Sequence, residues 1–246
     1  MTTGGSNIGG LRELAALAAG GPAKAQAPAC SWLWNPAIGA LRIFFGTCAR
    51  WTILGREHIP PTGPVIVAAN HFSFLDPPLV GSAFTRSGHV MAKRELSAGK
   101  AGWLMDHLGV IPVTRGEADV DALGMALDCL RRGEVIGIFP EGTRGREETH
   151  ALKPGHRGVA LLAHLSGAPV IPIGIAGSDA VTRLSDLYHM PLRRPPITVN
   201  MGPTIRFQRY DKLPPSAVLT ETTDAIMTAI ARQLPDSYRG VYADRC

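Results

Sequence analysis

Several familiar chemical signatures are missing from this chain of 246 residues. No G-x-S-x-G occurs, which argues against a nucleophile-elbow hydrolase. G-x-G and P-loop sequences are missing too, which removes the usual dinucleotide and phosphate-loop fingerprints. The four cysteines form neither a C-x-x-C pair nor a zinc-binding spacing, so a reduced cytosolic setting is the default expectation. Residues 1–30 have no long apolar run after a basic start, so a secretory signal is not expected either.

Charged residues are also scarce. They make up 18% of the chain, against about 25% in a typical soluble domain. Apolar residues reach 45%, and the mean hydropathy is slightly positive. This pairing fits an α/β core with part of its surface turned toward lipid.

The net charge of +5 is concentrated in two stretches of the chain. Residues 1–60 carry five basic and two acidic side chains, and residues 183–212 carry six and two. Basic surface suits an anionic membrane or a phosphorylated substrate, and an ordinary solvated face is the alternative. Nucleic acid is not expected, because few aromatics accompany these charges and no nucleic-acid motif occurs.

From Gly55 onward, short apolar runs alternate with amphipathic stretches. The runs predict strands at 65–69, 89–92, 110–113, 135–139, 170–175 and 197–201. The amphipathic stretches predict helices at 76–84, 97–108, 119–132, 156–165 and 216–234. Repeated βα units predict an α/β domain over residues 55–246, with a largely parallel sheet flanked by helices.

Residues 1–54 are expected to form a separate N-terminal region. Its Gly- and Ala-rich beginning is expected to be flexible, with a short helix over residues 11–19. Residues 32–54 have tryptophans near both ends and Arg42 in the middle. Tryptophan favours a membrane interface, and a central Arg costs roughly 3 kcal/mol in a bilayer. We therefore expect a helix lying in one leaflet, with Arg42 free to reach headgroups; a true span and a soluble core helix are the alternatives.

A histidine and an aspartate follow the first predicted strand. His71 comes just after the run at 65–69, and Asp76 opens the next predicted helix. Sheets of this class carry their chemistry at the carboxyl ends of the strands. A histidine whose ring is held by a carboxylate is a suitable general base for an alcohol. His71 and Asp76 are therefore the candidate catalytic pair; the alternative is that Asp76 only caps the helix.

Further charged side chains follow two other predicted strands. Arg115 comes after the run at 110–113, and Glu141 and Arg144 come after the run at 135–139. Arginine binds phosphate through a bidentate fork, so convergence at one sheet edge would surround the base with phosphate-binding cations. A structural salt bridge is the alternative for Glu141. Weaker candidates for the same pocket are Lys153, His156 and Arg157.

Four blocks, in this order, resemble those of the 1-acylglycerol-3-phosphate acyltransferase family of glycerolipid acyltransferases. The first is an N-H-x4-D pattern at 70–76, and the second is a glycine followed six residues later by an arginine, at 109–115. The third, F-P-E-G-T-R at 139–144, is a full match, and the fourth is an apolar strand with a central proline at 170–173. The second block lacks the aromatic that often precedes its final residues. The resemblance covers roughly residues 50–210.

The resemblance implies that His71 is the base and that Asp76 orients it. It also implies a substrate-binding set around the acceptor's phosphate, made of Arg115, Glu141, Gly142, Thr143, Arg144, Lys153 and Arg157. The implied reaction moves a fatty acyl group from an acyl-CoA or acyl carrier protein thioester to the free hydroxyl of 1-acylglycerol 3-phosphate, giving phosphatidic acid. No metal and no cofactor are expected. Acylation of glycerol 3-phosphate or another lysolipid, and a catalytically silent lipid-binding module, are the alternatives.

In this family the segment before the first block commonly anchors the enzyme to the membrane, which agrees with the interpretation of residues 32–54. The expected partners are the thioester, the lysophospholipid acceptor and a membrane surface. The expected location is the cell membrane, peripheral or monotopic, with the catalytic domain on the cytoplasmic side.

Overall fold

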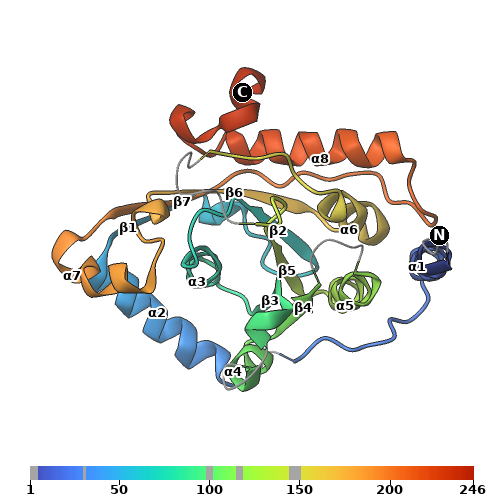
Figure 1. Cartoon of the computed structure of the whole chain (residues 1–246), viewed down its shortest axis with the longest axis horizontal. Coiled ribbons are helices and arrows are strands. Elements are labelled where there is room, and N and C mark those ends of the chain that lie inside the picture. Colours follow the sequence, from blue (N-terminus) through green and yellow to red (C-terminus); the bar gives the residue numbers. More distant parts are fainter. Residues whose placement is uncertain (1–4, 30–31, 98–101, 115–118, 144–150) are drawn as a thin grey trace.

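The computed structural model describes residues 5–29, 32–97, 102–114, 119–143 and 151–246. They form an α/β fold around a seven-stranded sheet, with helices on both sides (Figure 1). The strand order is β1-β7-β6-β2-β5-β3-β4. The strands are β1 (Arg50–Leu54), β2 (Val65–Ala69), β3 (Gly88–Lys93), β4 (Val110–Val113), β5 (Val135–Ile138), β6 (Val170–Ala176) and β7 (Pro196–Met201).

The α-helices alternate with these strands over much of the chain, and short 3-10 helices occupy several of the connections. The α-helices are α1 (Gly5–Ala18), α2 (Trp34–Cys48), α3 (Asp76–Ala83), α4 (Gly102–His107), α5 (Val120–Arg131), α6 (Gly158–Ser166), α7 (Met190–Arg193) and α8 (Ser216–Ala231). The 3-10 helices are η1 (Arg56–His58), η2 (Arg94–Ser97), η4 (Ser178–Ala180), η5 (Leu184–Tyr188), η6 (Asp236–Tyr238) and η7 (Gly240–Arg245).

The largely parallel sheet predicted from the βα rhythm is confirmed. Five of the six strand pairings are parallel. The sixth, between β6 and β7, is antiparallel and sets Ala176 beside Thr198. The connection between these strands folds into η4, η5 and α7 and enters β7 at the edge where β6 ends. Since β1 runs parallel to β7, both of these strands begin at the edge where β2 and β6 end.

The two faces of the sheet bury two separate apolar cores. Alternate residues of a strand face opposite sides. In β2, Ile66 and Ala68 join the core under α1, α5, α6 and α8, whereas Val65 and Val67 join the core under α2, α3 and α7. Figure 1 shows α8 and α2 on opposite sides of the sheet. Because all of β2 is buried, the strand is apolar at every position rather than at alternate ones.

Helix α5 illustrates how local sequence sets the ends of an element. The Asp119 carboxylate accepts a hydrogen bond from the N–H of Ala122 at 2.9 Å and so caps the start of the helix. Leu123 and Leu127 on one face are buried in the core. Gly133 follows the helix with a φ of +80°, a conformation that glycine adopts without strain. The helix predicted over 119–132 is therefore confirmed.

The N-terminal region differs from expectation in its elements. The segment expected to be helical over 32–54 is helical only as α2, and its last five residues form β1, which pairs with β7. Helix α1 begins earlier than the short helix predicted over 11–19, and it buries Leu14 and Leu17 against α5. No helix among the described residues combines the length and the apolar character that crossing a bilayer requires.

Arg42 is exposed, but its guanidinium group hydrogen-bonds to α3, which corrects the expectation that it is free to reach headgroups. Its Nε donates to the carbonyl of Ser82 at 2.9 Å, and its Nη2 donates to the carbonyl of Phe84 at 2.6 Å. These carbonyls lie at the C-terminal end of α3, where helix acceptors need outside donors and a cation is favoured by the helix dipole. Ile38 and Phe45, on the same face of α2, are buried. Arg42 therefore fixes α2 against α3.

Other helices also have bounds that differ from the predicted ones, and α6, predicted over 156–165, spans Gly158–Ser166. The helix expected over 97–108 is represented by η2 and α4, and residues 98–101 between them lie outside the described residues. Helix α8 ends at Ala231, three residues earlier than expected, although Leu234 beyond it is still buried.

Candidate active site

The strand ends that carry the predicted chemistry meet at one edge of the sheet. β2 runs parallel to β5, with Ala68 beside Ile138. The segments that follow, beginning with Asn70 and His71 after β2 and with Phe139 after β5, therefore leave the sheet side by side. This is the carboxyl edge, where α/β sheets place their ligands.

His71 is held by the aspartate predicted to orient it. Its Nδ1 lies 3.1 Å from Oδ2 of Asp76. Because a carboxylate oxygen accepts hydrogen bonds, this contact puts a proton on Nδ1, and in the neutral ring the lone pair is then on Nε2. The side chain of His71 is 12% exposed and that of Asp76 is fully buried. The ring of Phe139 lies against the imidazole, with 4.5 Å between centroids, and restricts its rotation.

The turn between the two residues explains their spacing. Oδ2 of Asp76 also accepts from the N–H groups of Phe72 at 2.6 Å and Ser73 at 2.7 Å. Asp76 is the first residue of α3, yet these donors precede the helix, so its carboxylate closes the turn rather than capping the helix. Its Oδ1 is buried and has no hydrogen-bond partner among the described residues. The N-H-x4-D spacing thus folds the carboxylate back onto the ring and onto the intervening backbone.

Two further residues of this turn tie it to the neighbouring chain, although the sequence pattern gave neither of them a role. Asn70 bridges to β6: its Nδ2 donates to the carbonyl of Ile175 at 2.9 Å, and its Oδ1 accepts from the same residue's N–H at 2.7 Å. The hydroxyl of Ser73 donates to the carbonyl of Val181. Asn70 and Ser73 are fully buried, so these contacts replace water for both side chains. The available signal was that Asn70 directly follows an apolar run, and Ser73 had no such signal.

Glu141 is buried and faces the backbone of the catalytic turn. Its Oε1 accepts from the N–H of His71 at 2.8 Å, and its Oε2 accepts from the N–H of Lys153 at 3.2 Å. The side chain is nearly inaccessible, and this burial raises its pKa to about 7, although both N–H groups and the Lys153 ammonium oppose the rise. Glu141 therefore links the segment after β5 to the segment after β2.

Gly142 is required by the turn that follows Glu141. Its φ is +67°, and a Cβ at this position would lie 2.7 Å from Cδ2 of His156. The N–H of His156 donates to the carbonyl of Pro140 at 2.8 Å. The imidazole of His156 thus packs on the turn, which agrees with the tight turn expected from the glycine.

The structure describes only some of the cationic residues that were predicted to bind the substrate. Arg115 and Arg144 lie outside the described residues, so their placement stays a prediction. Thr143, the last described residue before the second of them, is exposed. Arg157 donates through Nη1 to the hydroxyl of Ser216 at 2.7 Å, at the first residue of α8. The structure therefore ties Arg157 to α8.

No sequence pattern indicates a role for the C-terminal segment, yet η6 and η7 brace the site. The N–H of Leu152 donates to the carbonyl of Tyr238 at 2.9 Å. The N–H of Gly155 donates to the hydroxyl of Tyr242 at 3.4 Å. The ring of Tyr238 also lies 5.6 Å from that of Phe72 in the catalytic turn. This segment is too short and irregular for a periodic signal.

Among the residues that the structure describes, one group of potential metal ligands lies elsewhere, near the edge where β3 and β5 begin. Donor atoms of His89, Cys129 and Glu134 all lie within 4.8 Å of one another. Arg132 donates to both oxygens of Glu134, at 3.0 and 2.9 Å, and to Sγ of Cys129 at 3.2 Å. Burial raises the pKa of the Cys129 thiol to about 12, so the thiol keeps its proton. The group is a hydrogen-bonded ion network around an arginine.

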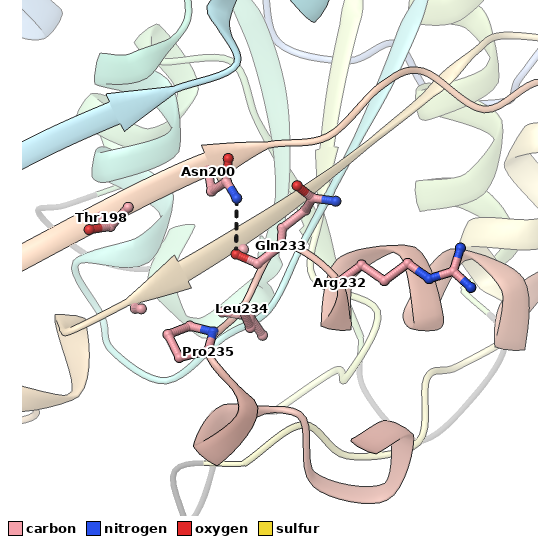
Figure 2. A pocket seen from close by; sticks show the side chains of 8 residues that line it. Thr198, Asn200, Arg232, Gln233, Leu234 and Pro235 are labelled. Carbon is pink, nitrogen blue, oxygen red and sulfur yellow. Dashed lines mark hydrogen bonds between the residues drawn. The ribbon is translucent and has the colours of Figure 1, made fainter. Parts of the chain in front are cut away.

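A hollow of about 300 Å³ lies between the β6–β7 pair and the end of α8 (Figure 2). Asn200 extends over it from β7 and donates through Nδ2 to the carbonyl of Gln233 at 3.3 Å. Arg232 supplies the ionisable side chain of the lining, and neither a base nor a nucleophile joins it. The lining residues are Gly174, Ala176, Thr198, Asn200, Arg232, Gln233, Leu234 and Pro235. We therefore assign the chemistry to the turn that carries His71 and not to this hollow.

The part of the chain that carries His71 is similar to known proteins. The family model described as Acyltransferase matches residues 50–176. A Bacillus subtilis protein named 1-acyl-sn-glycerol-3-phosphate acyltransferase is 27% identical over 143 residues, which cover 57% of this chain and 70% of the relative. A sheep (Ovis aries) protein named 1-acyl-sn-glycerol-3-phosphate acyltransferase alpha is 37% identical over 133 residues, or 50% of this chain and 44% of the relative.

The fold also has a solved counterpart. The crystal structure of the 1-acyl-sn-glycerophosphate acyltransferase PlsC from Thermotoga maritima superposes with a TM-score of 0.59 and 20% sequence identity. The match covers 80% of this chain and 78% of the other. The matched region spans less than half of the sheep relative's length, so similarity covers only part of that protein.

Proposed function

Because the chain belongs to the 1-acylglycerol-3-phosphate acyltransferase family, we propose that it transfers a fatty acyl group to the free hydroxyl of 1-acylglycerol 3-phosphate, forming phosphatidic acid. The donor is a thioester of CoA or of acyl carrier protein. The observation that carries the proposal is the contact of His71 with buried Asp76 at the carboxyl edge of the sheet, inside the region that the family model matches.

In the proposed reaction His71 serves as base and then as acid. Its Nε2 takes the proton of the acceptor hydroxyl as that oxygen attacks the thioester carbonyl. The carbon–sulfur bond then breaks, and the departing thiolate takes the proton back from the imidazolium. Asp76, bonded to Nδ1–H, fixes the tautomer and stabilises the transient positive charge. Because the acceptor oxygen attacks the thioester directly, no covalent acyl-enzyme forms. The ring of His71 is neutral again at the end of the cycle.

The other predicted site residues divide into positioning and binding roles in this proposal. Glu141 positions His71 through the backbone N–H, and Gly142 permits the turn that presents Thr143. Arg115 and Arg144 bind the acceptor's phosphate, since forked guanidinium groups match phosphate oxygens.

The proposed substrate is a membrane lipid, so we infer that the protein works at the cytoplasmic face of the cell membrane, peripherally or monotopically. Helix α2 supports this inference. Ala40, Ile43 and Thr47 on its outward face are exposed and uncharged, and the neighbouring Arg42, also exposed, has its guanidinium group hydrogen-bonded to α3. Such a face suits an interfacial helix.

The proposal is tested by an acyl-transfer assay with purified protein. Labelled acyl-CoA and acyl carrier protein thioesters are each offered with 1-acylglycerol 3-phosphate, glycerol 3-phosphate and a neutral lysolipid. Preferred formation of phosphatidic acid from the first acceptor, abolished in His71→Ala, is the expected result. Preference for glycerol 3-phosphate or another lysolipid would replace the assigned acceptor. No transfer from either donor to any acceptor would overturn the enzymatic assignment in favour of a silent lipid-binding module.

A further inference from the structure

A short segment near the site exposes an unusual amount of apolar surface. Leu184, Tyr188 and Leu192 are 72%, 84% and 86% exposed, and they lie within nine residues of one another on η5 and α7. Single exposed apolar side chains are ordinary on a protein surface, whereas a group of large ones indicates a contact surface. We call the segment from Arg183 to Arg194 the η5–α7 lip.

The η5–α7 lip has a net positive charge. Arg183, Arg193 and Arg194 are exposed. The acidic residue of the lip, Asp186, accepts through Oδ2 from the N–H groups of Thr182 and Arg183 at 3.0 and 2.8 Å, and its charge is near those of Arg183 and Arg193. Apolar side chains flanked by arginines match a lipid interface, where the apolar side chains enter the headgroup region and the guanidinium groups meet anionic phosphates. A tyrosine among them suits the same interface.

The η5–α7 lip is anchored to the body of the protein. Met190, at the start of α7, is 1% exposed and belongs to the core shared with α2 and α3. Arg194 donates through Nη2 to the carbonyl of Gly46 in α2 at 3.5 Å. Figure 1 shows α7 beside one end of α2, and the two helices are in contact. Ile43, on the outward face of α2, is 70% exposed. The lip therefore continues the uncharged face of α2.

The lip also begins directly beside the catalytic turn. Val181, two residues before it, accepts the hydroxyl hydrogen bond of Ser73. The antiparallel pairing of β6 with β7 brings the chain into β7 from the carboxyl edge, and β1 enters from the same edge. The elements that precede these two strands, α7 and α2, consequently lie at the edge that carries His71.

We propose that the η5–α7 lip is a second membrane-docking surface, which together with the outward face of α2 seats the catalytic edge on an anionic lipid bilayer. The three apolar side chains insert among the headgroups, and the arginines contact lipid phosphates. This proposal extends the proposed function, because it brings a lipid acceptor to the side of the molecule where His71 lies. Lipid binding itself does not depend on acyl transfer.

The test compares vesicle binding by full-length variants. Leu184, Tyr188 and Leu192 are replaced together by serine, and Val241→Ser serves as the control, since Val241 is 60% exposed on η7 at the C-terminal end. Sedimentation with vesicles of neutral phosphatidylcholine, alone or with one-third phosphatidylglycerol, measures the partition constant. We expect the triple variant to bind mixed vesicles at least about tenfold more weakly and the control to bind as the wild type does.

A charge variant tests the second component of the lip. Arg193→Gln should weaken binding to the mixed vesicles about fivefold, since an interfacial cation contributes about 1 kcal/mol. It should leave binding to neutral vesicles unchanged. Arg206→Gln, at an exposed arginine outside the lip, is the control. Because this variant removes a single exposed charge, it keeps the proposal testable if the triple variant fails to fold.

Two outcomes would overturn the docking surface. The first is that the triple variant and the charge variant both bind mixed vesicles as strongly as the wild type does. The second is that the wild-type protein binds no vesicles, in which case the lip would face a protein partner. The proposed function fails separately. Wild-type protein that binds mixed vesicles through the lip but transfers no acyl group keeps the docking surface and loses the acyltransferase assignment.

Discussion

The carboxylate of Asp76 gathers three donors on one oxygen, the imidazole of His71 and two backbone N–H groups. The backbone donors fix the carboxylate without help from the ring, so the turn keeps its shape when the ring is absent. Replacing His71 should therefore remove the imidazole while leaving the turn held by Asp76 in place. That separation makes the residue suitable for a clean kinetic test.

His71→Ala should lower kcat by at least about 10²-fold, the lower end of what base catalysis contributes. Asp76→Asn should be severely impaired as well, because the ring loses the group that fixes its tautomer. Steady-state kinetics report the loss, and circular dichroism of both variants checks the fold. Turnover near the wild-type value in a folded His71→Ala protein would remove the assigned base.

Glu141 should make stability depend on pH. Its pKa is about 7 in the folded protein against an ordinary 4.5, so the folded state binds the proton more tightly. As the pH rises from about 4.5 to about 7, the folded state therefore loses stability relative to the unfolded chain. At about 1.4 kcal/mol per pKa unit, the loss reaches at most roughly 3 kcal/mol.

Glu141→Gln removes this titration. Urea unfolding of both proteins at about pH 5 and about pH 8 measures the difference between their free energies of unfolding. The difference should move in favour of the variant by up to roughly 3 kcal/mol at the higher pH. A difference that is the same at both pH values would show that Glu141 titrates normally.

Arg115 and Arg144 can be examined through substrate affinity. Arg115→Lys and Arg144→Lys keep the charge but lose the planar fork. The KM for the lysolipid acceptor should rise more than the KM for the thioester, with a smaller change in kcat. Arg206→Lys is a matched control, since Arg206 is an exposed arginine outside the predicted substrate-binding set. Equal rises for both substrates would argue against phosphate binding.

The positions of His71, Asp76 and Glu141 could be predicted because each follows an apolar run that had to be a buried strand. Their partners could not. Glu141 bonds to the backbone N–H of His71, seventy residues earlier in the chain, and Asn70 bonds to Ile175 across β6. A side chain that bonds to a backbone group places no requirement on the residue type of its partner. Such contacts therefore cannot be predicted from the sequence and depend on the register of the sheet.

Helix α2 shows how an element can be predicted while the contacts of one of its residues are missed. The sequence placed Arg42 among lipid headgroups, but its guanidinium group hydrogen-bonds to carbonyls at the end of α3. A cap on another helix is decided by packing, which sequence periodicity does not report. Residues 50–54, with β-branched and aromatic side chains, were joined to the same helix because the break at Ala49 carries neither Gly nor Pro.

Arg42→Gln should weaken the contact of α2 with α3. A hydrogen bond to a charged group contributes about 1.5–3 kcal/mol, and partial exposure reduces this to an expected net loss of about 1–2 kcal/mol. Thermal unfolding should show a lower Tm for Arg42→Gln and an unchanged Tm for Arg206→Gln. Equal melting of the two variants would mean that the capping contacts contribute nothing to stability.

The whole sheet follows from the βα rhythm except at one edge. The parallel strands β2 to β6 match the predicted runs, and helices cover both faces as expected. The reversal at β7 could not be predicted, because the connection 177–195 contains only short helices that give no periodic signal. The role of β1 as the partner of β7 depends on that reversal and was missed with it.

The pairing of β1 with β7 allows the predicted boundary at residue 54 to be tested. Deleting residues 1–54 removes β1, exposes β7 as an edge and takes Phe45 from the core. Deleting residues 1–29 removes only α1 and its linker. We expect the shorter deletion to give a folded protein with a reduced Tm, and the longer one to aggregate or to lack a cooperative transition. Equal Tm values for the two proteins would show that residues 55–246 fold alone.

The antiparallel reversal at β7 places α2–β1 and α7–β7 at one end of the sheet. Their strands join the other strands through the single β6–β7 pairing, and α2 also packs on α3, beside the catalytic turn. A chimera that takes both of these units from a relative should adopt that relative's lipid preference and keep its own acyl-transfer chemistry. Lipid preference and acyl-transfer chemistry could then evolve, or be engineered, independently within one sheet.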